Sequence, residues 1–152
     1  MKYSVEALKR FLIGSLAIEG IYRPPTQREI EATMSFLDGA CTADTVIELQ
    51  EVYAPGMPLR DQPTMNVAVG NYIAPRGHTG MRRQLATVLV EEGPWSAHVL
   101  FEQLHPFMDG NGRTGRAVWA WKMLRKNDDP FALSFLHKWY YQTLQYADAG
   151  RN

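Results

Sequence analysis

The sequence predicts an all-α domain: a helical bundle around a central buried helix, with one small β-hairpin. Three observations lead to this prediction. Most segments repeat their apolar residues at the 3.6-residue period of an α-helix. The segment 113–125 is apolar nearly all round, which is typical of a helix in the centre of a fold. Between residues 65 and 74 the period changes to two, which predicts a short two-stranded hairpin.

Helix start and stop signals divide the chain into elements. The first helix carries Leu8, Leu12 and Leu16 on one face and ends before a glycine. Thr26 and the Glu three residues later form a capping box that opens the second helix. Pro94 suits the first position of a later helix, which ends at His105-Pro106. The expected helices are 4–19, 26 onward, 43–53, 81–92, 94–104, 113–125 and 133–147.

Composition and charge limit the class of protein. The chain has 152 residues, 45% of them apolar, with 16 Lys+Arg against 16 Asp+Glu. This length predicts one domain over residues 1–152 that needs no disulfide or structural metal. The lone Cys41 fits a reducing compartment, so we expect a cytoplasmic protein. Balanced charge argues against a nucleic-acid partner. The longest apolar run, 11–18, is too short to cross a membrane, so no membrane partner is expected.

The segment 105–116 combines residue types that suit an anion site beside a base. Four of its residues tolerate positive φ, which lets a loop curl and point N–H groups inward: Asp109, Gly110, Asn111 and Gly112. The following helix adds its unpaired N–H groups and the positive end of its dipole. Arg113 and Arg116 share one face of that helix and suit a second phosphate.

A metal ligand and a base lie in the same segment. Asp109 is one hard carboxylate among phosphate-binding groups, which is how Mg²⁺ is commonly held. Pro106 biases His105 out of helical geometry, toward the loop. Ordinary turns, a helix-end histidine and solvated arginines would give the same residues. The chemistry of the residues alone leaves both interpretations open.

The string His105-Pro106-Phe107-x-Asp109-Gly-Asn-Gly-Arg113-x-x-Arg116 resembles the Fic-domain signature at all nine specified positions. The resemblance implies a mostly helical Fic fold, with its core at about residues 60–147. It also implies an enzyme that moves AMP from ATP to a hydroxyl side chain of a target protein. His105 would be the base, and Asp109 would hold Mg²⁺. The nucleotide would be bound by Gly110, Asn111, Gly112, Arg113 and Arg116.

Several activities stay open within this resemblance. Kinase-like relatives replace the Gly-Arg pair and bind the nucleotide reversed, so Gly112 and Arg113 favour nucleotidyl over phosphoryl transfer. The alternatives are phosphoryl or other nucleotidyl transfer, removal of AMP from a target, and a non-catalytic nucleotide-binding module. The intact His105 argues against the last of these. Nothing in the sequence identifies the target protein or the oligomeric state.

The hairpin resembles the flap of the same family, an exposed strand to which a target protein adds by main-chain pairing. An ordinary connecting hairpin is equally open from the sequence. The flap would comprise residues 65–74, and Arg60 is a weaker candidate for placing the target. The candidate docking residues are Asn66, Val67, Val69 and Tyr72.

The first helix carries an acid on its apolar face. Glu19 falls among the leucines of that face, where an unpaired carboxylate is costly. It therefore needs a cation, unless the helix frays and leaves it in solvent. Ser15, Glu19 and the following glycine also resemble the inhibitory motif of Fic enzymes. That resemblance implies that residues 1–20 are an inhibitory helix whose Glu19 pairs with Arg116 in the γ-phosphate position.

Two further expectations concern the rest of the chain. The remaining histidines and the cysteine have no zinc-ligand spacing, so no zinc site is expected. Tyr140 and Tyr141 are candidates for self-modification, although packing is the more ordinary role.

Overall fold

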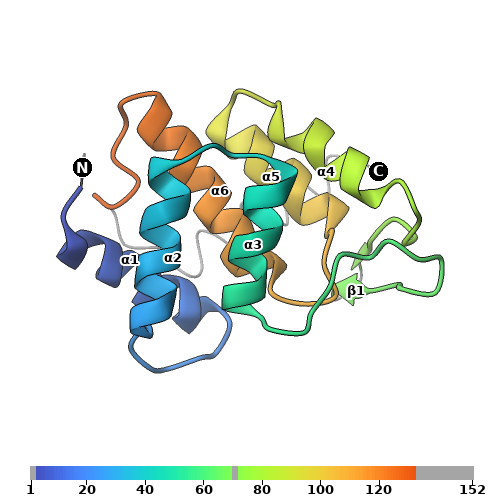
Figure 1. The fold of residues 1–152 in the computed structure, drawn as a ribbon, viewed down its shortest axis with the longest axis horizontal. Helices are drawn as coiled ribbons and strands as arrows, with labels where there is room; N and C mark the ends of the chain where they lie inside the picture. Colours follow the sequence, from blue (N-terminus) through green and yellow to red (C-terminus); the bar gives the residue numbers. More distant parts are fainter. Residues whose placement is uncertain (1–2, 70–71, 133–152) are drawn as a thin grey trace.

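A computed structural model describes residues 3–69 and 72–132 and is mostly helical, which confirms the predicted fold class (Figure 1). The predicted helix 133–147, with Tyr140 and Tyr141, lies outside the described residues. Within them the elements are α1 (Val5–Ile18), α2 (Gln27–Asp38), α3 (Ala43–Tyr53), β1 (Ala68–Val69), β2 (Tyr72–Ile73), α4 (Met81–Leu89), α5 (Pro94–Leu104) and α6 (Asn111–Arg125).

Three helices begin at the capping or proline signals that are visible in the sequence. The Ser4 hydroxyl accepts a hydrogen bond from the Ala7 N–H and caps α1. The predicted capping box of α2 is present, because the side chains of Thr26 and Glu29 each accept the other residue's N–H. Pro94 is the first residue of α5, where its missing N–H costs nothing.

Two helix boundaries differ from the prediction by two or three residues. α4 ends at Leu89 rather than Glu92, because the N–H groups of Val90 and Glu91 bond three residues back and the chain then turns toward Pro94. α6 starts two residues before the predicted Arg113. Of the residues expected to tolerate positive φ, only Gly110 uses it, and Asn111 already has helical geometry.

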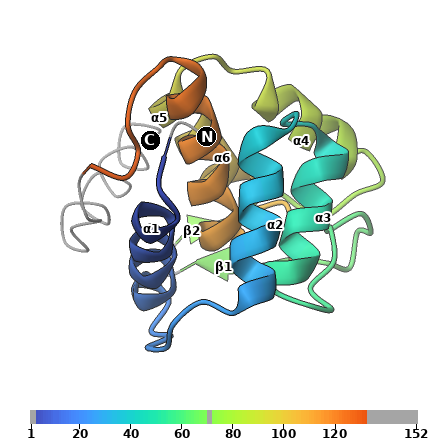
Figure 2. The same cartoon turned by 60° about the vertical axis from the view of Figure 1, so that its left-hand side comes forward.

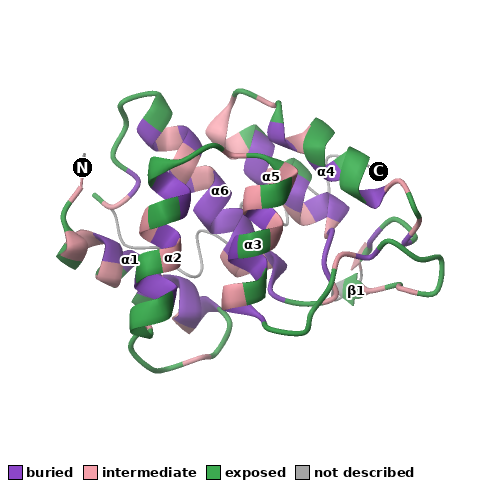
Figure 3. Cartoon of the chain, in the orientation of Figure 1, coloured by how far each residue is buried: buried purple, intermediate pink, exposed green. Residues whose placement is uncertain are grey.

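The helix α6 is the centre of the fold, as predicted. It contacts α5, α3, α2 and α1, and Figure 2 shows it between α1 on one side and α2 with α3 on the other. The described part of the core is one cluster to which every helix contributes, including Leu8, Leu37, Val46, Leu85, Phe101 and Val118. The outer faces of α2, α3 and α4 are largely exposed (Figure 3). In the described ranges, every helix is too short or too polar to cross a membrane.

The hairpin is shorter than predicted. Its antiparallel strands pair Ala68 with Ile73 and Val69 with Tyr72, so each strand has two residues. One further backbone bond, from the Ala74 N–H to the Val67 carbonyl at 3.3 Å, extends the pairing outside the strands. The flanking Met65 and Pro75 instead direct their carbonyls to the Arg60 guanidinium, at 3.0 and 2.7 Å.

Candidate functional site

The loop between α5 and α6, residues 105–110, is held by a neighbouring extended segment. The Arg60 N–H donates to the Pro106 carbonyl at 2.8 Å, and the Met108 N–H donates to the Pro58 carbonyl at 3.0 Å. Leu59 forms an antiparallel bridge with Phe107, whose side chain is completely buried. The loop is therefore part of a small backbone ladder that fixes its path.

Asn111 closes the same loop with its side chain. Its Oδ1 accepts from the Phe107 N–H, and its Nδ2 donates to the Phe107 carbonyl, both at 2.9 Å. Both amide atoms of Asn111 thus bond to Phe107 and hold the start of α6 against the loop. Its backbone N–H, at the start of α6, is a group that could serve an anion.

Gln50 of α3 is a buried organiser of the loop that the sequence interpretation missed. Its Nε2 donates to the Asp109 carbonyl at 2.6 Å, and its Oε1 accepts from the Thr114 hydroxyl at 2.6 Å. A Cβ on Gly110, whose φ is +80°, would lie 2.7 Å from the Ala54 side chain. The available signal was a glutamine on the inward face of α3, next to Leu49.

His105 ends α5 in a left-handed conformation, with φ 50° and ψ 61°. Its Nδ1 lies 3.2 Å from the Glu102 carbonyl, which can only accept, so Nδ1 carries the proton and Nε2 is the free base. Burial is the main cause that lowers the pKa of His105 below its ordinary value. The ring is therefore neutral near pH 7 and able to take a proton.

Asp109 lies on the exposed side of the loop. One carboxylate oxygen, Oδ1, accepts from the Gly110 N–H at 2.8 Å. No group of three or more His, Cys, Asp or Glu side chains that could hold a metal occurs in the part of the chain that the structure describes. A single exposed carboxylate still fits Mg²⁺, which binds through one or two carboxylates together with phosphate oxygens and water.

Glu19 lies against the first turn of α6. A Cβ on Gly112 would lie 2.3 Å from the Glu19 Oε1. The first N–H groups of a helix have no acceptor within it, and the helix dipole adds a positive partial charge there. The Glu19 carboxylate therefore occupies a position that favours anions.

Arg116 joins α6 to α1 through several hydrogen bonds. Its Nη2 donates to the Glu19 Oε1 at 2.8 Å and to the Ser15 carbonyl at 2.9 Å, and its Nε donates to the Ser15 hydroxyl at 2.7 Å. Arg116 is 1% exposed, whereas the Glu19 side chain is 34% exposed. The structure thus brings Ser15, Glu19 and Arg116 together, and α1 does not fray before Glu19.

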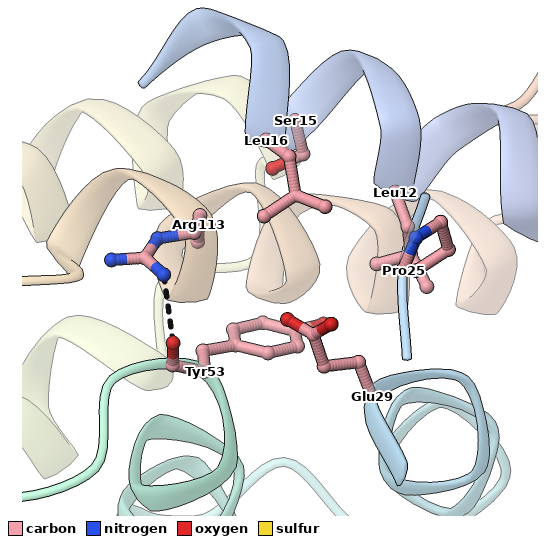
Figure 4. Close-up of a pocket in the computed structure, with 7 residues that line it drawn as sticks. All are labelled: Leu12, Ser15, Leu16, Pro25, Glu29, Tyr53 and Arg113. Carbon is pink, nitrogen blue, oxygen red and sulfur yellow. Dashed lines mark hydrogen bonds between the residues drawn. The ribbon is translucent and has the colours of Figure 1, made fainter. Parts of the chain in front are cut away.

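Arg113 points in a different direction from Arg116. Its Nη1 donates to the Tyr53 carbonyl at 2.7 Å, which Figure 4 shows as a dashed line. Its Nε is buried and has no hydrogen-bond partner among the residues that the structure describes. It lines a small pocket between α1, α2, α3 and α6 with Leu12, Ser15, Leu16, Pro25, Glu29 and Tyr53 (Figure 4).

Glu102 is a second acid near Arg116 that the sequence interpretation missed. Its Oε1 is buried without a hydrogen-bond partner in the described ranges, and a Cβ on Gly115 would lie 2.5 Å from it. Burial raises the pKa of Glu102 to about 7, with a lowering effect of Arg116 and a raising effect of Glu19. The available signal was an acid next to Phe101, on a helix face directed toward α6.

Two of the candidate docking residues have side chains that hydrogen-bond within the protein. The Tyr72 hydroxyl donates to the Gln103 carbonyl of α5 at 2.5 Å, so it is not directed toward a target. The Asn66 side chain accepts from the Gly77 N–H at 3.2 Å and donates to the Pro63 carbonyl at 3.0 Å. Docking on the hairpin would thus depend on its backbone and on the partly exposed Val67.

Comparison with protein families gives one match. The model of the Fic/DOC family matches residues 40–122, which is more than half of the chain. The match begins just before α3 and includes the whole loop and most of α6, whereas α1 and Glu19 lie outside it. A comparison with curated proteins gives no match.

Proposed function

The chain belongs to the Fic/DOC family, and from that premise we propose that it is an autoinhibited protein adenylyltransferase. It would transfer AMP from ATP to a hydroxyl side chain of a target protein. The observation that carries the proposal is the arrangement of one loop. It begins at His105, whose Nδ1 is paired with the Glu102 carbonyl, and it ends at the N-terminus of α6, against which the Glu19 carboxylate lies.

The reaction divides among the residues as follows. The His105 Nε2 removes the proton of the target hydroxyl, and the hydroxyl oxygen attacks the α-phosphorus of ATP. The bond from the α-phosphorus to the bridging oxygen breaks, and pyrophosphate leaves. The N–H groups at the start of α6 stabilise the negative charge on the phosphates. Gly110 and Gly112 let the backbone approach them closely, because neither residue has a Cβ.

Asp109 supplies the carboxylate for Mg²⁺. When bound, this ion would neutralise phosphate charge and hold the triphosphate for in-line attack. Asp109 is suited to this because it is exposed and the Gly110 N–H fixes one of its oxygens. Arg113 and Arg116 would contact the phosphates after exchanging their present partners, the Tyr53 carbonyl and Glu19.

Residues 1–20 act as an inhibitory helix in this proposal. The Glu19 carboxylate and the γ-phosphate are both anions, and they compete for Arg116 and for the N-terminus of α6. While Glu19 is bound, ATP cannot take a productive position. The target would dock on the hairpin as an added strand, so that its hydroxyl meets His105.

The test compares the parent with Glu19→Gly at equal concentration, each incubated with Mg²⁺ and ATP labelled at either the α- or the γ-phosphate. We expect α-label in protein, faster with Glu19→Gly, and no γ-label. Glu19→Gly combined with His105→Ala is the matched control and should incorporate neither label. Incorporation of γ-label alone would contradict nucleotidyl transfer. Equal rates for the parent and a folded Glu19→Gly variant would contradict the inhibitory helix.

A further inference from the structure

Arg60 is a buried cation without an acidic partner. Its side chain is completely buried, and it forms no ion pair with a carboxylate within residues 3–69 and 72–132. Instead, its guanidinium donates four hydrogen bonds to backbone carbonyls. The acceptors are the carbonyls of His105 at 2.6 Å, Pro75 at 2.7 Å, Leu104 at 2.8 Å and Met65 at 3.0 Å.

These acceptors belong to two different parts of the fold. Leu104 and His105 are the last residue and the cap of α5. Met65 and Pro75 flank the hairpin on its two sides. One rigid guanidinium therefore connects the end of the helix that carries the base to both ends of the segment that would receive the target.

The hairpin segment completes the C-terminal end of α5. The last four carbonyls of a helix have no intrahelical donor. Here the Glu102 carbonyl is bonded by the His105 ring and the Gln103 carbonyl by the Tyr72 hydroxyl. Arg60 serves the carbonyls of Leu104 and His105. Each of these four acceptors is thus served by the ring of the base itself or by a residue from the segment 60–72.

Packing alone does not explain a charge at this position. Removing a guanidinium from water is costly, and an apolar side chain of similar volume is often at least as stabilising. Arginine has a planar guanidinium that donates hydrogen bonds in several fixed directions, and neither lysine nor methionine has such a group. The negative end of the α5 dipole lies at the same place and compensates part of the cost.

We propose that Arg60 is a positioning residue, which sets the base His105 at a fixed place relative to a target strand on the hairpin. This inference rests on the proposed function for its catalytic consequence. The left-handed backbone of His105 is unfavourable for a residue with a side chain and needs support from its surroundings. Two bonds supply that support, one from the Arg60 Nε to the His105 carbonyl and one from the Arg60 N–H to the Pro106 carbonyl.

The experiment compares Arg60→Met and Arg60→Lys in the Glu19→Gly background. Arg28→Met, an exposed arginine on α2, is the matched control. Arg60→Met should lower kcat on the order of 10²-fold, the effect of a misplaced reacting group. The KM for ATP should stay unchanged, because the nucleotide groups lie on α6. Arg60→Lys should not restore kcat, because one ammonium cannot reach acceptors on both parts of the fold.

A second measurement does not depend on activity. The His105 ring is titrated by NMR in the parent and in each Arg60 variant. Asp109 and Glu19 also act on this ring and raise its pKa, whereas Arg60 lowers it. Arg60→Met should shift the His105 titration to higher pH, and Arg60→Lys should shift it less because the charge is kept. Circular dichroism and thermal melting establish that each variant is folded.

The outcomes separate the two proposals. If Glu19→Gly transfers AMP and folded Arg60→Met is equally active, or Arg60→Lys restores full kcat, the positioning role is wrong and the proposed function stands. If Glu19→Gly transfers nothing, the proposed function fails. In that case an unchanged His105 titration in Arg60→Met also removes the positioning role, and a shifted one supports it.

Tyr72→Phe covers the case in which no Arg60 variant folds. It removes one bond between the hairpin and α5, the Tyr72 hydroxyl to the Gln103 carbonyl, and leaves the ring in place. We expect a loss of about tenfold in kcat with unchanged KM for ATP. Tyr22→Phe, at a largely exposed tyrosine, is its control. An unchanged kcat in Tyr72→Phe would then overturn the inference.

Discussion

Two buried arginines flank the candidate site, and they are held in opposite ways. Arg60 is bonded to backbone carbonyls, which cannot leave without unfolding the end of α5 or the hairpin. Arg116 donates to the Glu19 carboxylate and to Ser15, at the C-terminal end of α1, and this carboxylate is partly exposed. The first arrangement is permanent. The second can be exchanged for another anion, which is what regulation by competition requires.

The largest effect is expected at His105, the proposed base. His105→Ala should lower AMP transfer on the order of 10²–10⁴-fold, because general-base catalysis is lost. Binding of Mg²⁺-ATP, measured by calorimetry in the Glu19→Gly background, should be unchanged. Transfer close to that of Glu19→Gly itself would show that neither arginine serves a base at this position.

The free energy of unfolding, measured with and without nucleotide, distinguishes the role of Arg116 from that of Arg60. Glu19→Gly leaves the buried Arg116 without its carboxylate, which should lower the free energy of unfolding by about 1–3 kcal/mol. Saturating Mg²⁺-ATP should restore the lost stability, because the triphosphate replaces the carboxylate. Arg60→Met should also be destabilised, but nucleotide should not restore it selectively. Thermal melting with and without nucleotide measures both. Equal rescue of the two variants would contradict the comparison.

The buried Glu102, near Arg116, makes the stability of the fold depend on pH. Its pKa rises from 4.5 to about 7 in the fold, so between these values the folded state holds a proton that the unfolded state has released. Its contribution to stability is complete below about pH 4.5 and is lost as pH rises to about 7. The full loss approaches ~3 kcal/mol at about 1.4 kcal/mol per pKa unit.

Glu102→Gln tests this, because glutamine is neutral at every pH. Urea unfolding of parent and variant at pH 5 and pH 8 should show that the variant gains stability relative to the parent at the higher pH. Parallel pH curves would show that the Glu102 carboxyl does not titrate in this range.

The smallest effect is expected from Ser15→Ala. The Arg116 Nε would lose its hydroxyl acceptor at 2.7 Å, while the bonds to Glu19 and to the Ser15 carbonyl remain. We expect a loss of about 1 kcal/mol in stability and a modest increase in AMP transfer, smaller than that of Glu19→Gly. Both are measured beside Ser4→Ala, which removes only the N-cap of α1. Transfer as fast as in Glu19→Gly would mean that Ser15, not the carboxylate, holds the inhibited state.

The elements that local chemistry specifies could be predicted from the sequence. The capping box at Thr26, the proline at the start of α5 and the apolar period of α3 depend on residues within a few positions of each other. The end of α4 and the start of α6 were misplaced by two or three residues, because backbone bonds at helix ends are weakly specified by local sequence.

In the candidate site, the sequence by itself determined the candidate residues that lie close together along the chain. These are His105, Asp109, Gly110, Gly112, Arg113 and Arg116. The position of Glu19 on an apolar helix face indicated that it needs a cation, and the family resemblance implied that this cation is Arg116; the structure pairs the two. Only the tertiary structure decided the roles of Arg60, Gln50 and Glu102. Gln50 and Arg60 bond to the end of α5 and the loop after it from positions far earlier in the chain, and Glu102 is buried against α6. Contacts of this kind depend on which helices pack together, so no local sequence pattern specifies them.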